Sequence, residues 1–189
     1  MTISSEIAKA ILDRAQEKSI SITPLKLQKL MYYCQGYFLA AYGERMFDEN
    51  VKAWQHGPVV ESVYHQYKGF GSLQIPHTPG VSFTSLSEQT QNMIDYILDS
   101  LGAFGAWALR NKTHNEAPWI SSYNAAHAGN VDITDAKMTN FFTLELANEQ
   151  DFQLAKILDS SEKTGIRSNL LELPHDVNTE EDFVNWING

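Results

Sequence analysis

His114 and Glu116 are the residues of this chain whose types and spacing best suit acid–base or metal chemistry. They lie two positions apart, so on an extended segment their side chains point to the same face, where His56 and His65 could join them around a metal ion. Structural zinc sites draw on closely spaced cysteine and histidine pairs, and catalytic ones need three ligands. With one cysteine and scattered histidines, the sequence predicts no metal, no cofactor and no catalytic residue. The simpler interpretation is that His114 and Glu116 bond backbone groups where a helix ends in a loop.

The single cysteine, Cys34, shares an apolar helical stripe with Leu30, Met31 and Phe38. A thiol in such a place is usually an inert hydrophobic side chain, whereas a nucleophile needs an exposed, electropositive setting. The chain has no GxSxG, GxxxxGK or HExxH motif. We therefore expect that it is not an enzyme, and a hydrolase built on the His–Glu pair is a lesser hypothesis.

Tyrosine and tryptophan side chains are the candidates for protein contacts, because interfaces are enriched in them. The chain offers Tyr32, Tyr33, Tyr37, Tyr64, Tyr67, Trp54 and Trp119. Core packing accounts for most of these. Adjacent helical positions diverge by about 100°, so Tyr32 and Tyr33 cannot both follow the stripe of Leu27 and Leu30. We expect at least one of the two to face a second element or to be an exposed anchor for a partner.

The composition is that of a soluble domain. A length of 189 residues suits one domain, or one domain with an appendage, that closes its own hydrophobic core. No apolar run approaches the roughly 20 residues of a membrane-spanning helix, and no secretory signal is present. We therefore expect a cytoplasmic protein without membrane contact.

Charge is unevenly distributed along the chain. The net charge is −9, and residues 159–189 account for −5 of it. This acidic tail either attracts a basic partner or only keeps the protein soluble. Residues 1–45 instead carry a net charge of +2, with a helix-turn-helix-like spacing across Ile20 to Pro24. Nucleic-acid binding usually needs a denser basic stripe, so DNA binding is kept only as an alternative.

Hydrophobic periodicity predicts a mainly α fold, a compact multi-helix domain with a minor short β element. Three helices are expected in the first part of the chain: one from residues 2–5 onward, one from the N-cap Thr23 and Pro24 to Gly43, and one from Gly57-Pro58 to Tyr67. Three more are expected after residue 84. The first follows a capping-box spacing at Ser85 and Glu88, the second runs through Phe104, Trp107, Ala108 and Asn111, and the third follows the cap Thr134. Residues 46–54 are expected to form short strands around a turn at residues 48–50, and Ala117 to be extended because a proline follows it. Further helical patterns cover residues 152–158 and 179–187, and residues 170–173 suit a strand.

Four segments together resemble a known family. They are LKLQKLMYYCQGYFLAAYG at 25–43, VKAWQHGPVVESVYHQYKGFG at 51–71, THNEAPW at 113–119 and DITDAKMTNFF at 132–142. Over roughly residues 5–145 the chain resembles the Panacea domain of SocA-like antitoxins. The resemblance implies a helical domain at residues 1–145 and leaves residues 146–189 as an acidic C-terminal extension.

Members of this family occur in bacteria, phages and mobile elements, and the resemblance implies an antitoxin that neutralises a cognate toxin by binding it. One branch delivers its toxin to a AAA+ protease. The alternative is a DNA-binding regulator of such an operon. The resemblance supplies no catalytic residue. The candidate partner contacts and family-motif residues are Tyr32, Tyr33, Trp54, Gly57, Pro58, Val59, His114, Glu116, Pro118 and Trp119.

Overall fold

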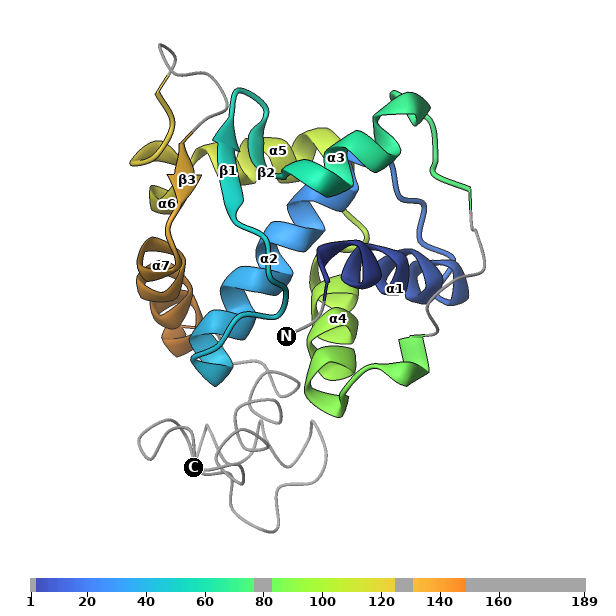
Figure 1. Cartoon of the computed structure of the whole chain (residues 1–189), viewed down its shortest axis with the longest axis horizontal. Helices are drawn as coiled ribbons and strands as arrows, with labels where there is room; N and C mark the ends of the chain where they lie inside the picture. Colours follow the sequence, from blue (N-terminus) through green and yellow to red (C-terminus); the bar gives the residue numbers. More distant parts are fainter. Residues whose placement is uncertain (1–2, 77–82, 125–130, 149–189) are drawn as a thin grey trace, which may run out of the picture.

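The computed structural model describes residues 3–76, 83–124 and 131–148. Within these residues seven α-helices form the body of the molecule, and a three-stranded antiparallel sheet lies at one end (Figure 1). The elements in chain order are α1 Ser4–Glu17, α2 Pro24–Tyr42, β1 Val51–Trp54, β2 Gly57–Val60, α3 Glu61–Tyr67, the 3-10 turns η1 Lys68–Phe70 and η2 Phe83–Ser85, α4 Glu88–Leu101, α5 Ala106–His114, α6 Ala117–Ile120, β3 Asp132–Ile133 and α7 Asp135–Asn148. The predicted fold class, mainly α with a minor β element, is confirmed.

Helix α2 runs through the middle of the molecule (Figure 1), and all of its residues except Leu25 are buried. It begins as predicted, because the Thr23 hydroxyl accepts a hydrogen bond from the Lys26 N–H at 3.4 Å and Pro24 occupies the first turn. It ends as predicted at Gly43, which has a φ of 71°. A helix enclosed on all sides must pair its polar side chains inside the protein, since an unpaired buried polar group is costly.

Helix α7 packs closely against α2. A Cβ at Gly36 would lie 2.0 Å from the Phe142 ring, so this position of α2 admits the ring only as glycine. The same ring lies 5.4, 6.0 and 4.7 Å from the ring centroids of Tyr32, Tyr33 and Tyr37. These edge-to-face and tilted arrangements are favourable for aromatic rings and form the centre of the core.

The sheet has the strand order β2-β1-β3, and both neighbouring pairs are antiparallel. Trp54 pairs with Gly57, so the hairpin turns at Gln55 and His56. The prediction of a turn at residues 48–50 was therefore wrong. The signal that mattered was the glycine after the turn, which has a φ of 95°.

The prediction that Gly57-Pro58 opens a helix was also wrong. Both residues belong to β2, and the helix begins three residues after the proline, at Glu61. Proline is as well suited to an edge strand as to the first turn of a helix. β2 is at the edge of the sheet, which local sequence does not show.

Residues 48 and 49 cap two helices instead of forming a turn. Asp48 Oδ1 accepts a hydrogen bond from the Ser4 N–H of α1 at 3.3 Å, and Glu49 Oε1 accepts one from the Ser62 N–H of α3 at 2.8 Å. Carboxylates at helix N-termini satisfy free amides and complement the helix dipole. The loop before β1 thus fixes the ends of two helices that are distant in sequence.

Two other helix starts differ from the predictions. Helix α4 is capped by Ser87, whose hydroxyl accepts from the Thr90 N–H at 3.3 Å, and not by Ser85. Ala117 is the first residue of α6, and the extended residue is Glu116, with φ of −98° and ψ of 136°. A proline is tolerated in the first turn of a helix, where its missing N–H would have no intrahelical partner, so α6 starts at Ala117 against the usual preference of a residue before proline.

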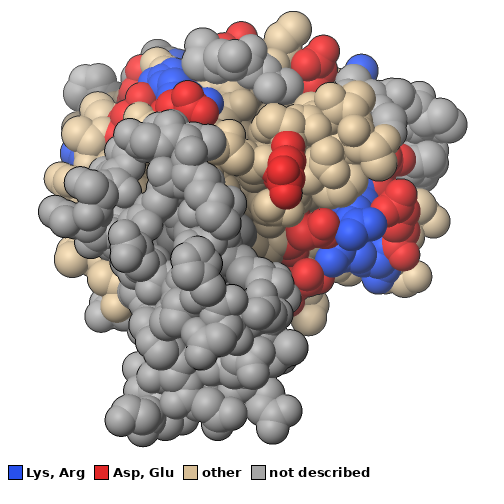
Figure 2. All heavy atoms as spheres, turned by 90° about the horizontal axis from the view of Figure 1, so that it is seen from below, with Lys and Arg blue, Asp and Glu red and all other residues tan. Residues whose placement is uncertain are grey.

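Helices α1 and α4 form a layer in the lower half of the molecule (Figure 1). Each buries an apolar face and pairs charges at its rim, where Arg14 Nε lies 2.7 Å from Asp95 Oδ1 and Lys18 Nζ lies 2.6 Å from Asp99 Oδ1. Figure 2 shows basic and acidic side chains side by side on the lower face. The pairing is typical of amphipathic helices whose charged faces meet at the surface.

The C-terminal part is described up to Asn148. Thr134 caps α7 as predicted, accepting from the Lys137 N–H at 3.4 Å. The helices predicted at residues 152–158 and 179–187 and the strand at 170–173 lie outside the described residues, and the division at residue 146 stays a prediction. None of the helices described has the length and apolar character needed to cross a membrane.

Candidate functional site

The hairpin and the α5–α6 corner, two of the segments singled out from the sequence, lie against each other. His114 places Nε2 3.0 Å from the Gln55 carbonyl oxygen and Nδ1 2.7 Å from that of Arg110. The Trp119 indole N–H donates to the Trp54 carbonyl at 2.9 Å, and the His114 and Trp119 rings are 3.8 Å apart. As predicted, His114 bonds backbone groups where a helix ends, but the same prediction for Glu116 was wrong, because its carboxylate bonds the side chains of Tyr33 and Lys112. The contacts of His114 and Trp119 hold the hairpin onto the corner.

His114 and Glu116 do not form a pair. Both nitrogens of the His114 ring face carbonyl oxygens, while the Glu116 carboxylate points to α2 and α5. The expectation that the two point to the same face was wrong, because one ends α5 and the other is the N-cap of α6. In the described part of the chain no three His, Cys, Asp or Glu side chains gather as a metal site.

Glu116 is the centre of a buried polar cluster. The Tyr33 hydroxyl donates to Glu116 Oε1 at 2.8 Å, and Lys112 Nζ lies 3.1 Å from the same oxygen. Burial raises the pKa of Glu116, and Lys112 and the hydrogen bonds partly offset that rise. Burial and the nearby carboxylate also raise the pKa of Tyr33, so its hydroxyl stays protonated and remains a donor.

The two adjacent tyrosines are both inside the protein. Tyr32 is 0% exposed and Tyr33 is 1% exposed, so the prediction of an exposed anchor at one of them was wrong. The physical reason is that α2 is covered on every side. The other part of the expectation is confirmed, since Tyr33 faces Glu116 and Tyr32 faces Phe142 of α7.

Two α2 side chains satisfy the outer edge of β2. Lys29 Nζ donates to the Pro58 carbonyl at 2.9 Å, and Gln28 Oε1 accepts from the Val60 N–H at 2.7 Å. Lys29 is fully buried, and desolvation, helped by the charge of Arg110, lowers its pKa to about 7. The Lys-Leu-Gln-Lys-Leu motif thus supplies the hydrogen bonds that a further strand would otherwise make.

Gly57 is required by this arrangement. Its φ of 95° is one that residues with a side chain rarely adopt. A Cβ there would also lie 2.7 Å from Lys29 Nζ and 2.8 Å from Thr113 Oγ1. The glycine therefore lets the hairpin approach α2 and α5 closely enough for the Lys29 bond to form.

Sequence reasoning missed Gln28, Lys29 and Lys26 as structural residues. The Lys26 ammonium donates to the Gly102 carbonyl at 2.6 Å and to that of Ser21 at 3.0 Å. The available signal was that α2 has apolar residues on all faces, which is typical of a buried helix and leaves its polar residues no solvent. The cysteine of this helix behaves as predicted: it is buried, and burial raises the pKa of its thiol.

A groove of about 620 Å³ opens between the start of α2, the hairpin and α3. The residues that line it are Pro24, Leu25, Gln28, Trp54, Gln55, His56, Val59, Glu61, Tyr64, Lys68 and Gly71. We call it the hairpin groove. Of the residues selected from the sequence, Trp54 and Val59 line it, and the others, Pro118 in the first turn of α6 among them, do not. Most of the residues selected from the sequence therefore lie behind the groove, where they hold the hairpin in place.

Comparison with known proteins gives a family match and one curated relative. The family model "Antitoxin SocA-like, Panacea domain" matches residues 27–120, about half of the chain. Antitoxin SocA of Caulobacter vibrioides (strain NA1000 / CB15N) is 37% identical over 69 residues, which are 36% of this chain and 37% of that protein. The match thus spans little more than a third of that relative. The comparison with solved structures gave no match.

The chain belongs to the SocA-like Panacea-domain family. The matched residues run from α2 to α6 and include the hairpin, so they contain the side-chain hydrogen bonds of Lys29, His114, Glu116 and Trp119 given above. The family match therefore includes the buried polar contacts behind the hairpin, together with α3 and α4.

Proposed function

We propose that this protein is an antitoxin that neutralises a cognate toxin by binding it directly. The observation that carries the proposal is the family match over residues 27–120, supported by the relative named Antitoxin SocA. Binding is favoured over catalysis because both ring nitrogens of His114 and the Oε1 atom of Glu116, which suggested chemistry, are engaged with partners inside the domain. On this proposal the protein acts in the cytoplasm, where its toxin is made.

A proteolytic adaptor is a more specific form of the same function. In that form the complex is delivered to a AAA+ protease instead of remaining as an inactive pair. The two forms differ in the fate of the toxin: a toxin inactivated by occupancy persists in the cell, whereas a delivered toxin disappears at a rate that depends on the protease.

The DNA-binding alternative loses its two supports. The helix at the recognition position of the suggested helix-turn-helix is α2, which is buried on all sides, whereas a recognition helix must expose a face to the major groove. Lys26 and Lys29, two of the cations behind the net charge of +2, are also buried. Residues 1–45 therefore expose less positive charge than their net charge of +2 suggests.

Co-expression tests the proposed function. The protein encoded by the adjacent reading frame is induced alone and together with this chain, growth is recorded, and the pair is purified through a tag on one member. We expect toxicity alone, rescue together, and a complex that co-purifies. Failure of both rescue and complex formation would contradict the proposal, and loss of the toxin only in cells with an active AAA+ protease would select the adaptor form.

A further inference from the structure

The walls of the hairpin groove are mainly apolar. Pro24 and Leu25 of α2, Trp54 and Val59 of the hairpin, and Tyr64 of α3 form them. Leu25 is the residue of α2 that is not buried, although it lies in a helix whose other residues are enclosed. An apolar side chain left open at a groove is a feature of binding sites more than of domain cores.

Large apolar side chains continue this surface beyond the groove. Trp107 of α5 is 63% exposed, and its ring lies 6.2 Å from that of His56, which lines the groove. On the other side Phe70 and Leu73 are exposed beside the lining residue Gly71. Single exposed apolar residues are ordinary, but a group of them around a groove marks an interaction surface.

The groove cannot be filled by an added β-strand. The Pro58 carbonyl and the Val60 N–H of β2 are already bonded to Lys29 and Gln28, and proline has no N–H to offer. Strand addition needs an edge with free donors and acceptors. A partner must therefore bind by placing side chains in the groove against Leu25 and against the Trp54 and Tyr64 rings, whose centroids are 4.8 Å apart.

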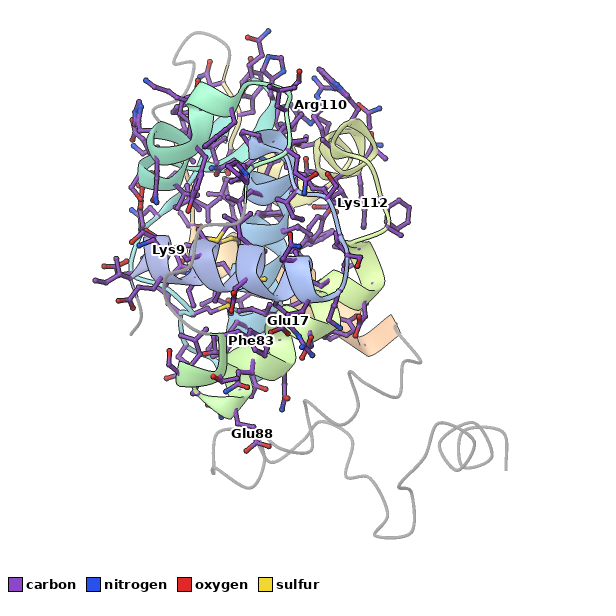
Figure 3. The ribbon with its side chains drawn as sticks, turned by 90° about the vertical axis from the view of Figure 1, so that its right-hand side faces the viewer. Lys9, Glu17, Phe83, Glu88, Arg110 and Lys112 are labelled. Carbon is purple, nitrogen blue, oxygen red and sulfur yellow. The ribbon has the colours of Figure 1, made fainter. Side chains whose placement is uncertain are left out.

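The lining of the groove holds one carboxylate and one ammonium, Glu61 and Lys68, so it is balanced in charge although the whole chain carries −9. Lys68 lines the groove, and Arg110 follows Trp107 by one helical turn; neither is ion-paired with a described residue. The Glu61 carboxylate is paired with Lys52, whose Nζ lies 3.6 Å away, so the charges here without an ion-pair partner among the described residues are those of Lys68 and Arg110. Figure 3 shows Arg110 at the upper end, with the labelled acidic residues Glu17 and Glu88 in the lower half.

We propose that the hairpin groove and the neighbouring Trp107 form the surface on which the toxin docks. The proposal rests on the antitoxin function proposed above and adds the chemistry of the contact. The toxin inserts an apolar or aromatic side chain from a segment flanked by aspartate or glutamate, whose charges approach Lys68 and Arg110. Opposite charges at the rim speed association, and the inserted side chain supplies most of the affinity.

The test is a binding titration with the purified protein encoded by the adjacent reading frame. Trp107→Ala and Leu25→Ala remove two apolar contacts, and Leu144→Ala is the matched control, since Leu144 is 66% exposed on α7. We expect each groove variant to weaken binding at least about tenfold and the control to change it less than about twofold. Thermal melting of each variant confirms that the fold is intact.

Charge reversal tests the chemistry of the partner. Lys68→Glu should weaken binding about fivefold or more, mainly through slower association, whereas Lys9→Glu on α1 should not. A complex whose affinity is unchanged in both apolar variants overturns the docking surface and leaves the antitoxin function standing. Tighter binding by Lys68→Glu overturns the acidic segment. The docking proposal is also overturned if this chain alone forms a dimer in sedimentation equilibrium and the groove variants abolish that dimer. If the co-expression test shows neither rescue nor a complex, the docking surface and the antitoxin function both fail.

Discussion

The upper and lower halves of the molecule are held together by different interactions. In the lower half α1 and α4 join apolar faces and pair charges at the surface, as Arg14 and Asp95 do. In the upper half Lys29 and Glu116, both buried, bond to groups on other elements. Surface ion pairs contribute little to stability, whereas a buried polar group that loses its partner is costly. The buried polar residues of the upper half should therefore be the ones that tolerate change least.

Gly57→Ala gives the largest expected loss within this comparison. The added Cβ would clash with Lys29 and Thr113 at a positive φ, and we expect the free energy of unfolding to fall by about 2–4 kcal/mol. Chemical denaturation measures it. Gly69→Ala is the control, because nothing lies within 4 Å of a Cβ there, and it should change stability by less than about 0.5 kcal/mol. Equal effects at both positions would show that the hairpin is not tightly held.

Glu116→Ala should cost about 2–3 kcal/mol of unfolding free energy, because it leaves the Tyr33 hydroxyl buried without its acceptor. Asp99→Ala breaks an ion pair of similar geometry with Lys18 at the lower surface and should cost about 1 kcal/mol or less. Glu116→Gln keeps an acceptor and should recover most of the loss. If the two alanine variants were equally stable, burial would not distinguish the two halves.

Because the pKa of the buried Lys29 amine is lowered, we expect the stability of the protein to depend on pH. Its pKa is about 7 in the folded protein and 10.5 when unperturbed, so between these values the unfolded chain binds the extra proton. Stability from this group therefore rises with pH from about 7 towards 10, by at most about 1.4 kcal/mol per pH unit. Denaturation at pH 7.5 and 8.5 measures the slope. The variant Lys29→Met should lose that contribution to the slope. If wild type and variant had the same slope of unfolding free energy against pH, the Lys29 amine would be in contact with water in the folded protein.

Trp119→Phe has the smallest expected effect. It removes the indole N–H that donates to the Trp54 carbonyl but keeps an aromatic ring against His114, so we expect a loss of about 1 kcal/mol. Trp107→Phe is the matched control, because Trp107 is exposed and donates no hydrogen bond to a described residue. Thermal melting compares the two. A larger loss at Trp107 would mean that this side chain is part of the core.

Helix boundaries were predictable where a local signal decides them. Thr23 with Pro24, Gly43 and Thr134 act at the ends that their side chains or backbone favour. The hairpin was not predictable in this way, because Gly57-Pro58 is compatible both with the start of a helix and with an edge strand. Trp107 was taken as a marker of its helix, yet the buried positions of α5 are Leu109 and Thr113. Which face of a short helix is covered depends on its neighbours.

By itself the sequence determined the fold class, the family and some of the residues that hold the hairpin in place, such as His114 and Trp119. The motif order and the 3.6-residue period of apolar residues are properties of the sequence, so they can be recognised without a structure. Only the tertiary structure decided what those residues do. It enclosed α2 on every side, and this made core residues of both Tyr32 and Tyr33, of which one could have been an exposed anchor, and made Lys29 a buried hydrogen-bond donor. Burial is set by elements far apart in sequence, and burial decides whether a polar or aromatic side chain meets water, a partner or the backbone.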